Sequence, residues 1–252
     1  KPIDSNGSKG VFIVSERDDL NFILNESFLN SSKKEIIIEE YIQRQGPQIC
    51  GDGYFLDNKI VFIHYGDGYF YDSHTCPYAE TFPSTHPNYI LKKATNNLET
   101  ILNKLKFKFG IFNFDVVVKK NGEIFVNEIG PRSGVNFIPE IIEFSTGFSL
   151  IDAELNLISN FKKIKFIKKY NFPFAGFMLH SNTEGILKEI VFSKKIEKLI
   201  VSKNIFIPIN SKVNRFLSSK DYIGNVILKF ESFDQMEDIF ERIEHFIKVK
   251  VI

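Results

Sequence analysis

Two apolar runs on either side of an Asn-Gly pair constrain the fold of this chain most strongly. The runs are residues 112–118 and 124–129, and Asn121-Gly122 lies between them. Asn-Gly favours a two-residue hairpin loop, because both residues tolerate the positive φ of a type I′ turn. The pattern therefore predicts two antiparallel strands whose register is fixed by a two-residue loop.

This register places two acidic residues opposite each other. With the loop at 121–122, Lys120 faces Glu123 and Asp115 faces Glu128. Opposed residues have Cβ atoms about 5 Å apart, and two carboxylates at that separation repel by about 3 kcal/mol at an effective dielectric near 20. A chain tolerates the pair if one acid is protonated or a cation binds between them. Mg²⁺ suits such an all-oxygen site and usually carries substrate phosphates; two solvated acids on an exposed hairpin are the alternative.

The composition is that of a globular protein and excludes several classes. The 252 residues are 43% hydrophobic, enough for a sizeable core in one large domain or two smaller ones. The net charge of +1 argues against binding to nucleic acid. Cys50 and Cys76 are too few for a disulfide framework or a cysteine zinc site, so a cytoplasmic location is expected. No apolar run approaches the roughly 20 residues of a membrane span, so no membrane partner is expected.

The residue pattern predicts an α/β (α+β) chain. Buried or paired strands are expected at 11–14, 35–41, 48–55, 59–65, 174–179, 185–191 and 226–230. Helices are expected at 15–28, 88–106, 138–144, 149–158 and 232–246, the first and the last of them after a capping-box signal. The stretch 66–88 is rich in turn formers and is predicted to be a long functional loop. A basic linker is expected at Lys162–Lys169.

The chain begins at Lys1 rather than Met and enters directly into the Gly- and Ser-rich loop Ser5–Gly10. We therefore expect the natural protein to extend upstream, with this chain as its C-terminal portion. Backbone N–H groups and hydroxyls of such a loop can fold over phosphates, and a neighbouring lysine adds a point charge. Ordinary surface turns share this composition, so a plain turn is the alternative.

Two further groups suggest nucleotide chemistry. Glu39 and Glu40 end the apolar run 36–38, where a carboxylate can accept a hydrogen bond from an adenine amino group. Arg132 follows Glu128 within a Gly-Pro-Arg-Ser-Gly turn, and an arginine beside a metal pair suits a transferring phosphoryl group. Solvated strand-end acids and an ordinary turn arginine are the alternatives.

Taken in order, these segments resemble the ATP-grasp superfamily, in its carboxylate–amine ligase branch. The resemblance covers roughly residues 1–160 and is carried by Lys1-Pro2, Gly7-Ser8-Lys9-Gly10, Ile38-Glu39-Glu40-Tyr41-Ile42, Gly110 to Asp115, and Val126-Asn127-Glu128-Ile129-Gly130-Pro131-Arg132. The last stretch is most similar to the purine-pathway carboxyaminoimidazole ribonucleotide synthetases.

The resemblance implies an ATP-grasp fold of antiparallel sheets with helices. It implies three units: a partial small lobe with a lid loop at 1–42, a large lobe with the metal site at 43–170, and a small C-terminal α/β appendage at 171–252 that packs on the large lobe. The family's N-terminal domain is missing from this chain.

The resemblance also implies ATP and Mg²⁺ as cofactors, with Mn²⁺ as a substitute. Asp115 and Glu128 would hold the metal, and Arg132 and Lys1 would be catalytic. The residues expected to bind the nucleotide are Lys1, Ser8, Lys9, Gly10, Glu39, Glu40, Ile42 and Gln48.

Among these, Lys1 would bind phosphates, Glu39 the adenine amino group, and Gln48 stands where many members place a ribose-binding glutamate. Gly130 stands where many members carry an asparagine metal ligand, which leaves open how a second metal is held.

The activity implied is an ATP- and Mg²⁺-dependent ligase that activates a carboxylate as an acyl phosphate and joins it to an amine, both small amino-acid-like molecules. A homodimer is compatible with this. Three alternatives stay open: purine-type ATP-dependent carboxylation or carbamoyl-phosphate-like chemistry, a non-catalytic nucleotide-binding relative, and an α/β domain with accidental matches.

Overall fold

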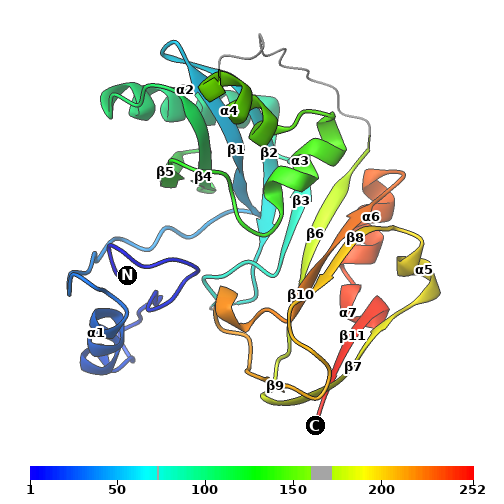
Figure 1. Ribbon diagram of the computed structural model, residues 1–252. Coiled ribbons are helices and arrows are strands. Elements are labelled where there is room, and N and C mark those ends of the chain that lie inside the picture. Colours follow the sequence, from blue (N-terminus) through cyan, green and yellow to red (C-terminus); the bar gives the residue numbers. More distant parts are fainter. Residues whose placement is uncertain (73, 160–171) are drawn as a thin grey trace.

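The computed structural model describes residues 1–72, 74–159 and 172–252. Within them, an antiparallel eight-stranded sheet has the order β5-β4-β1-β2-β3-β6-β10-β8 (Figure 1). Its strands are β1 (Gln48–Leu56), β2 (Lys59–Tyr69), β3 (Ala79–Phe82), β4 (Gly110–Val118), β5 (Ile124–Gly130), β6 (Phe174–Leu179), β8 (Ile200–Ile205) and β10 (Gly224–Lys229). A smaller sheet has the order β11-β7-β9, formed by Ile247–Val251, Gly185–Phe192 and Lys212–Val213. The predicted α+β class is confirmed.

Helices cover both faces of the large sheet. The helices of the described residues are α1 (Leu20–Leu29), which lies away from the sheet in the N-terminal segment (Figure 1), and α2 (Asn88–Lys104), α3 (Ile138–Thr146), α4 (Leu150–Ser159), α5 (Lys194–Glu197), α6 (Phe233–Phe240) and α7 (Ile243–Phe246), with a 3₁₀ turn at Ser219–Asp221. One face packs against α2 and, farther along, against α6, α7 and the small sheet. The opposite face packs against α3 and α4.

Alternation along each strand decides which face a side chain occupies. On β4, Phe112, Phe114 and Val116 are buried in the cluster under α2. Asn113 and Asp115 therefore lie on the face that carries α3. The same alternation on β1, paired with β4 as Cys50 to Asp115, sends Gln48, Cys50 and Asp52 to that face. The face that carries α3 thus gathers these polar side chains of β1 and β4.

The predicted hairpin forms, but its loop differs from the prediction. Lys119 and Glu123 close it through a 2.8 Å bond from the Lys119 N–H to the Glu123 carbonyl, and Val118 pairs with Ile124. The loop therefore has three residues, of which only Gly122 has a positive φ, at 76°. This matches the three-residue hairpin, in which a single residue takes the left-handed conformation.

A bulge in β5 restores the predicted pairing of the acids. Val116 pairs with Val126, whereas Asp115 pairs with Glu128, so the register shifts by one residue between these pairs. Asn127 is the extra residue on the bulged strand. The extra loop residue and the extra bulge residue shift the register in opposite directions and cancel. The predicted opposition of Asp115 and Glu128 is therefore confirmed.

The N-terminal segment departs most from the predicted strands. Residues 11–14 form no strand, and residues 35–41 contribute only an isolated bridge between Pro2 and Ile36. Ile38, predicted to be buried, is 79% exposed, because no sheet packs over it among the described residues. The helix predicted from residue 15 begins at Leu20, since Asp19 caps it by accepting from the N–H of Phe22.

The predicted loop 66–88 is shorter than expected. Its first residues extend β2 to Tyr69, and Ala79–Phe82 form β3 in the middle of the sheet. The helices predicted at 88–106, 138–144 and 149–158 are confirmed as α2, α3 and α4. The helix predicted at 232–246 is divided into α6 and α7.

The basic linker Lys162–Lys169 and the boundary at 170–171 lie outside the described residues. The division into units at 1–42, 43–170 and 171–252 stays a prediction, although β6, β8 and β10 continue the sheet that β1 to β5 begin. None of the helices in the described part of the chain combines the length and the apolar character that crossing a bilayer requires.

Candidate active site

The opposed acids Asp115 and Glu128 form the centre of the candidate site. Because they pair directly on adjacent strands, their side chains leave the same face of the sheet. Burial raises the pKa of Asp115 to about 6, and the charge of Glu128 adds to this rise. A hydrogen bond from the Gln48 side chain and the charge of Arg132 oppose it. Gln48, predicted to bind the nucleotide, therefore lies beside the acid pair.

Glu80 adds a buried acid that sequence reasoning missed. It lies on β3, is only 4% exposed, and accepts a 3.1 Å hydrogen bond from the Asn136 amide. Burial raises the pKa of Glu80 to about 8, and the charges of Asp115 and Asp52 contribute to the rise. Its second oxygen, Oε2, has no hydrogen-bond partner among the described residues. The carboxyl groups of Glu80, Asp115 and Asp52 all lie on the face of the sheet that carries α3. Their raised pKa values favour the protonated form of each group or a nearby cation.

Asp52 anchors the turn that carries Arg132. Both of its carboxyl oxygens accept from the Gly134 N–H at 2.9 Å, and one accepts from the Asn113 amide at 2.9 Å. A Cβ atom on Gly134 would lie 2.9 Å from Asp52 Oδ1, so this close approach requires glycine. Burial raises the pKa of Asp52 to about 7, although these bonds and the Arg132 charge lower it.

A cavity of about 390 Å³ lies at the Arg132 turn. Its lining comes from the lid loop, the turn, the start of α3 and the strands β6 and β10, and consists of Asn6, Gly7, Arg132, Val135, Asn136, Phe137, Met178, Phe206, Ser219, Tyr222, Gly224 and Asn225. Arg132 connects the cavity with the buried acids. It lines the cavity, and its charge lowers the pKa of Asp115 and of Asp52. The acid pair and the cavity therefore belong to one region.

The structure brings Lys1 and Glu39, both predicted to bind the nucleotide, together. Lys1 Nζ lies 2.6 Å from a Glu39 carboxylate oxygen. A 2.8 Å bond from the Ile37 N–H to the Lys1 carbonyl aligns the two segments. Glu40 lies 3.9 Å from the Lys119 ammonium at the end of the acid hairpin.

The predicted lid, residues 5–10, is docked against distant segments. The Ser8 hydroxyl donates to the Thr75 carbonyl at 2.8 Å, and the Ser219 N–H donates to the Gly7 carbonyl at 3.2 Å. A Cβ atom on Gly7 would lie 1.8 Å from the Ser219 hydroxyl oxygen. The predicted lid thus lies at one side of the cavity, to which it contributes Asn6 and Gly7.

The other residues expected to bind nucleotide make local contacts. Lys9 Nζ lies 3.5 Å from the Asn6 amide oxygen, and the Ser27 hydroxyl donates to the Gly10 carbonyl at 2.8 Å. Ile42 is half-buried in the extended connection that leads to β1. Their roles toward a nucleotide stay predictions.

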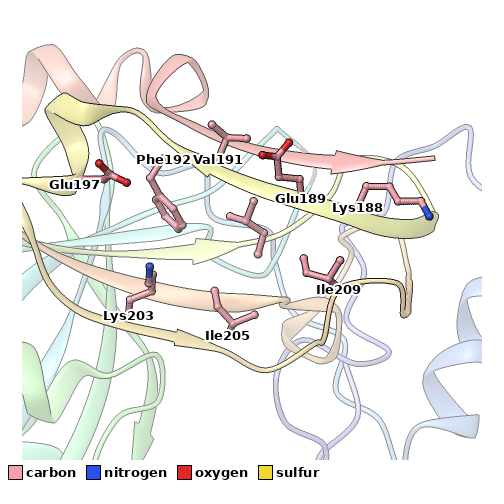
Figure 2. A pocket seen from close by; sticks show the side chains of 9 residues that line it. Lys188, Glu189, Val191, Phe192, Glu197, Lys203, Ile205 and Ile209 are labelled. Carbon is pink, nitrogen blue, oxygen red and sulfur yellow. The ribbon is translucent and has the colours of Figure 1, made fainter.

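A larger hollow of about 580 Å³ lies between β7 and β8 (Figure 2). Figure 2 shows the apolar side chains of Phe192, Ile205 and Ile209 in it, with Lys188 and Lys203 nearby. None of the predicted site residues lines this hollow. We therefore place the candidate active site at the acid pair.

The residues present fit a magnesium nucleotide. No group of three or more His, Cys, Asp or Glu side chains that suits a metal ion occurs within the described ranges. Asp115 and Glu128 alone would supply two carboxylates, and phosphates and waters usually complete the shell of Mg²⁺. Their direct opposition and the raised pKa of Asp115 are the marks of a site that a cation would stabilise.

Comparison with known proteins identifies the fold. No protein-family model and no curated protein matches the sequence. Phosphoribosylglycinamide synthetase from Anaerococcus prevotii matches in structure with a TM-score of 0.70 and 25% identity, covering 90% of this chain and 58% of that one. L-amino acid ligase from Bacillus licheniformis matches with a TM-score of 0.70 and 14% identity, over 84% and 55% of the two chains.

Biotin carboxylase from Campylobacter jejuni, in a complex with an ATP analogue, matches with a TM-score of 0.68 and 13% identity, over 98% of this chain and 56% of that one. The chain thus spans between 55% and 58% of the length of these three proteins. These matches show that the chain has the ATP-grasp fold and confirm its resemblance to ATP-grasp carboxylate–amine ligases.

Sequence reasoning missed Asp52, Glu80, Asn136 and Asn225 as site residues. Asp52 carried a usable signal, because a lone charged residue within a strand predicted to be paired is unusual. Glu80 carried none, since its strand lay inside a predicted loop.

Proposed function

We propose that this chain forms the nucleotide-binding and catalytic part of an ATP- and Mg²⁺-dependent ligase. The enzyme activates a carboxylate as an acyl phosphate and joins it to an amine. The observation that carries the proposal is the direct pairing of Asp115 with Glu128, next to an arginine that lines a cavity. The shared fold with ATP-dependent ligases supports it.

Each residue of the site has a role in this proposal. Asp115 and Glu128 hold Mg²⁺, which supplies charge neutralisation for the nucleotide phosphates when bound. The Gln48 amide orients Asp115 through its hydrogen bond. Arg132 stabilises the transferring phosphoryl group, and Asp52 fixes the turn that presents it.

The N-terminal segment binds the rest of the nucleotide. Lys1 contacts the phosphates and Glu39 accepts from the adenine amino group, with the backbone at Glu40 and Ile42 on the ring. Ser8, Lys9 and Gly10 belong to the lid, and its docking on Thr75 and Ser219 supports a closed position over the phosphates.

The reaction proceeds by two transfers. A carboxylate oxygen attacks the γ-phosphorus, and ADP leaves. The amine nitrogen then attacks the acyl carbon, inorganic phosphate leaves, and the nitrogen loses a proton. Positioning and charge neutralisation account for the catalysis, which agrees with a site of arginine, lysine and carboxylates.

The experiment is an assay of ADP release by the protein with Mg²⁺, single amino acids, pairs of amino acids, and bicarbonate. ADP release that needs both a carboxylate and an amine is expected. Release with bicarbonate alone would favour the carboxylation alternative. ATP binding without ADP release under any condition would overturn the ligase assignment and favour a nucleotide-binding relative.

A further inference from the structure

Asn225 is a buried amide with no hydrogen-bond partner. It lies on β10 and is 3% exposed. Neither its Oδ1 nor its Nδ2 atom meets a donor or acceptor in the described part of the chain. Buried amides are nearly always satisfied by protein, bound water or a ligand, so one without a protein partner marks a place where a water or a polar ligand group binds. Asn225 lines the 390 Å³ cavity beside Arg132.

The other polar groups near Asn225 already have partners. The Asn136 amide donates to Glu80 at 3.1 Å, and the Tyr222 hydroxyl donates to the Pro77 carbonyl at 2.5 Å. Asn225 therefore remains as the buried lining residue whose side-chain donor and acceptor both lack a partner among the described residues. A ligand that satisfies it must present both an N–H donor and an oxygen acceptor.

The charge of the lining limits the ligand further. Arg132 is the single charged residue among the described residues that line the cavity. One guanidinium matches one carboxylate, with good bidentate geometry available. The α-ammonium group of an amino acid is offset by its own carboxylate. An anionic side chain would be buried without a second cation, and a cationic side chain would add a positive charge beside Arg132 without an acid in the lining to offset it.

Four apolar side chains make up much of the rest of the lining, to which Asn6 and Ser219 also belong. Val135, Phe137, Met178 and Phe206 line the cavity. The rings of Phe137 and Phe206 are stacked, with centroids 6.4 Å apart and an angle of 13° between their planes. The volume lies at the lower end of the range for small-molecule sites, which extends from about 300 to 1,000 Å³. The walls thus suit a short apolar side chain.

We infer that this cavity binds the carboxylate substrate, that this substrate is an α-amino acid with an uncharged apolar side chain, and that Asn225 determines this specificity. The inference rests on the proposed ligase function. The carboxylate faces Arg132, and the amino group and a carboxylate oxygen satisfy Oδ1 and Nδ2 of Asn225. The side chain lies along Val135, Phe137 and Phe206.

The test is a calorimetric titration of the full chain, in the presence of Mg²⁺ and ADP, with L-leucine, L-aspartate and L-lysine. Leucine is expected to bind at least about tenfold more tightly than the other two. Asn225→Leu should weaken leucine binding by about tenfold or more, without affecting the binding of ADP. Its melting temperature should not fall, because an unsatisfied amide is replaced by an apolar side chain of similar shape. Asn97→Leu, at an exposed site on α2, is the matched control.

A second variant keeps the test decisive if Asn225→Leu does not fold. Val135 is 58% exposed, so Val135→Glu should fold, and its carboxylate should shift the preference from leucine to lysine. Equal binding of leucine to the wild type and Asn225→Leu, or no gain of lysine binding by Val135→Glu, would overturn the inference. So would wild-type binding of leucine no tighter than that of aspartate. Leucine binding without any ADP release would instead overturn the proposed ligase function and leave this specificity standing.

Discussion

Asp115 pairs directly with Glu128, although the loop that joins their strands is one residue longer than the Asn-Gly motif predicts. The longer loop shifts the register by one residue, and the bulge at Asn127 shifts it back before the acids are reached. A one-residue shift without the bulge would send Glu128 to the opposite face of the sheet. The bulge is therefore what keeps both carboxylates on the face that carries the cavity.

The first prediction concerns catalysis by this pair. Asp115→Asn and Glu128→Gln each remove one anionic ligand, so Mg²⁺-dependent ADP release should fall by two orders of magnitude or more, a loss of about 3 kcal/mol of transition-state stabilisation. Circular dichroism should show an intact fold. The control is Glu123→Gln, an exposed acid on the same hairpin. Unchanged ADP release in both variants would remove the metal assignment.

The second prediction concerns stability without metal. The double variant Asp115→Asn, Glu128→Gln removes the repulsion between two opposed carboxylates, so its melting temperature in EDTA should equal or exceed that of the wild type. Adding Mg²⁺ and ADP should stabilise the wild type more than the variant. A large decrease in the variant's melting temperature in EDTA would show that the pair is a structural contact.

The third prediction is a pH dependence. The pKa values of Asp115, Asp52 and Glu80 are raised to about 6, 7 and 8. Between the ordinary carboxyl pKa near 4 and these values, the native state retains protons that the unfolded chain has lost. The free energy of unfolding of the metal-free protein should therefore fall as the pH rises from about 4 to 8.

Variants separate the contributions to this profile. Asp115→Asn should remove the part of the decrease that ends near pH 6 and leave the part that continues to pH 8. Urea titrations of the metal-free protein at intervals of one pH unit measure this. A free energy of unfolding that rises over this range would contradict the raised pKa values.

The fourth prediction concerns Arg132. Arg132→Ala should reduce kcat by about 10² to 10³-fold, as removal of a group that stabilises developing charge usually does, with little effect on ADP binding. Loss of the guanidinium also removes a charge that lowers the pKa of Asp115, so the acid limb of the Mg²⁺-binding profile should move to higher pH. The control is Arg242→Ala, which removes a surface arginine that forms an ion pair with Asp238. An unmoved acid limb would place Arg132 away from the acid pair.

The fifth prediction concerns lid docking. Gly7→Ala places a Cβ atom where Ser219 Oγ lies, so the lid should shift and ADP release should decrease. Adding Ser219→Gly should restore part of the activity, although the positive φ of 61° at Gly7 keeps some strain in alanine. A double variant no more active than Gly7→Ala would show that the contact with Ser219 does not control the lid.

Local patterns predicted most of the helices and the opposition of the acids. An apolar stripe at helical spacing predicted α2; of its members Ile90, Leu91, Ala94, Leu98, Ile101, Leu102 and Leu105, four are buried, namely Ile90, Ala94, Leu98 and Leu102. The acid pair was also predicted, although the turn type was wrong. A bulge has no dependable local signature, so the compensation at Asn127 was visible only in the structure.

Long-range placement could not be predicted. Ile38 belongs to an apolar run that suggests burial, yet it is exposed, because burial depends on which other segments pack over the run. Glu80 and Asn225 are more than 140 residues apart, and both reach the site only because β3, β6 and β10 are neighbours in the sheet. Strand order is a property of the whole chain, and a single sequence does not display it.

Electron paramagnetic resonance of Mn²⁺ in the presence of ATP tests the central claim most directly, because it reports metal binding without requiring turnover or a known substrate. The wild-type full-length protein should take up Mn²⁺ with ATP, and the Asp115→Asn, Glu128→Gln double variant should bind it at least about a hundredfold more weakly. Equal Mn²⁺ uptake by the two proteins would contradict the claim that this pair holds the metal nucleotide.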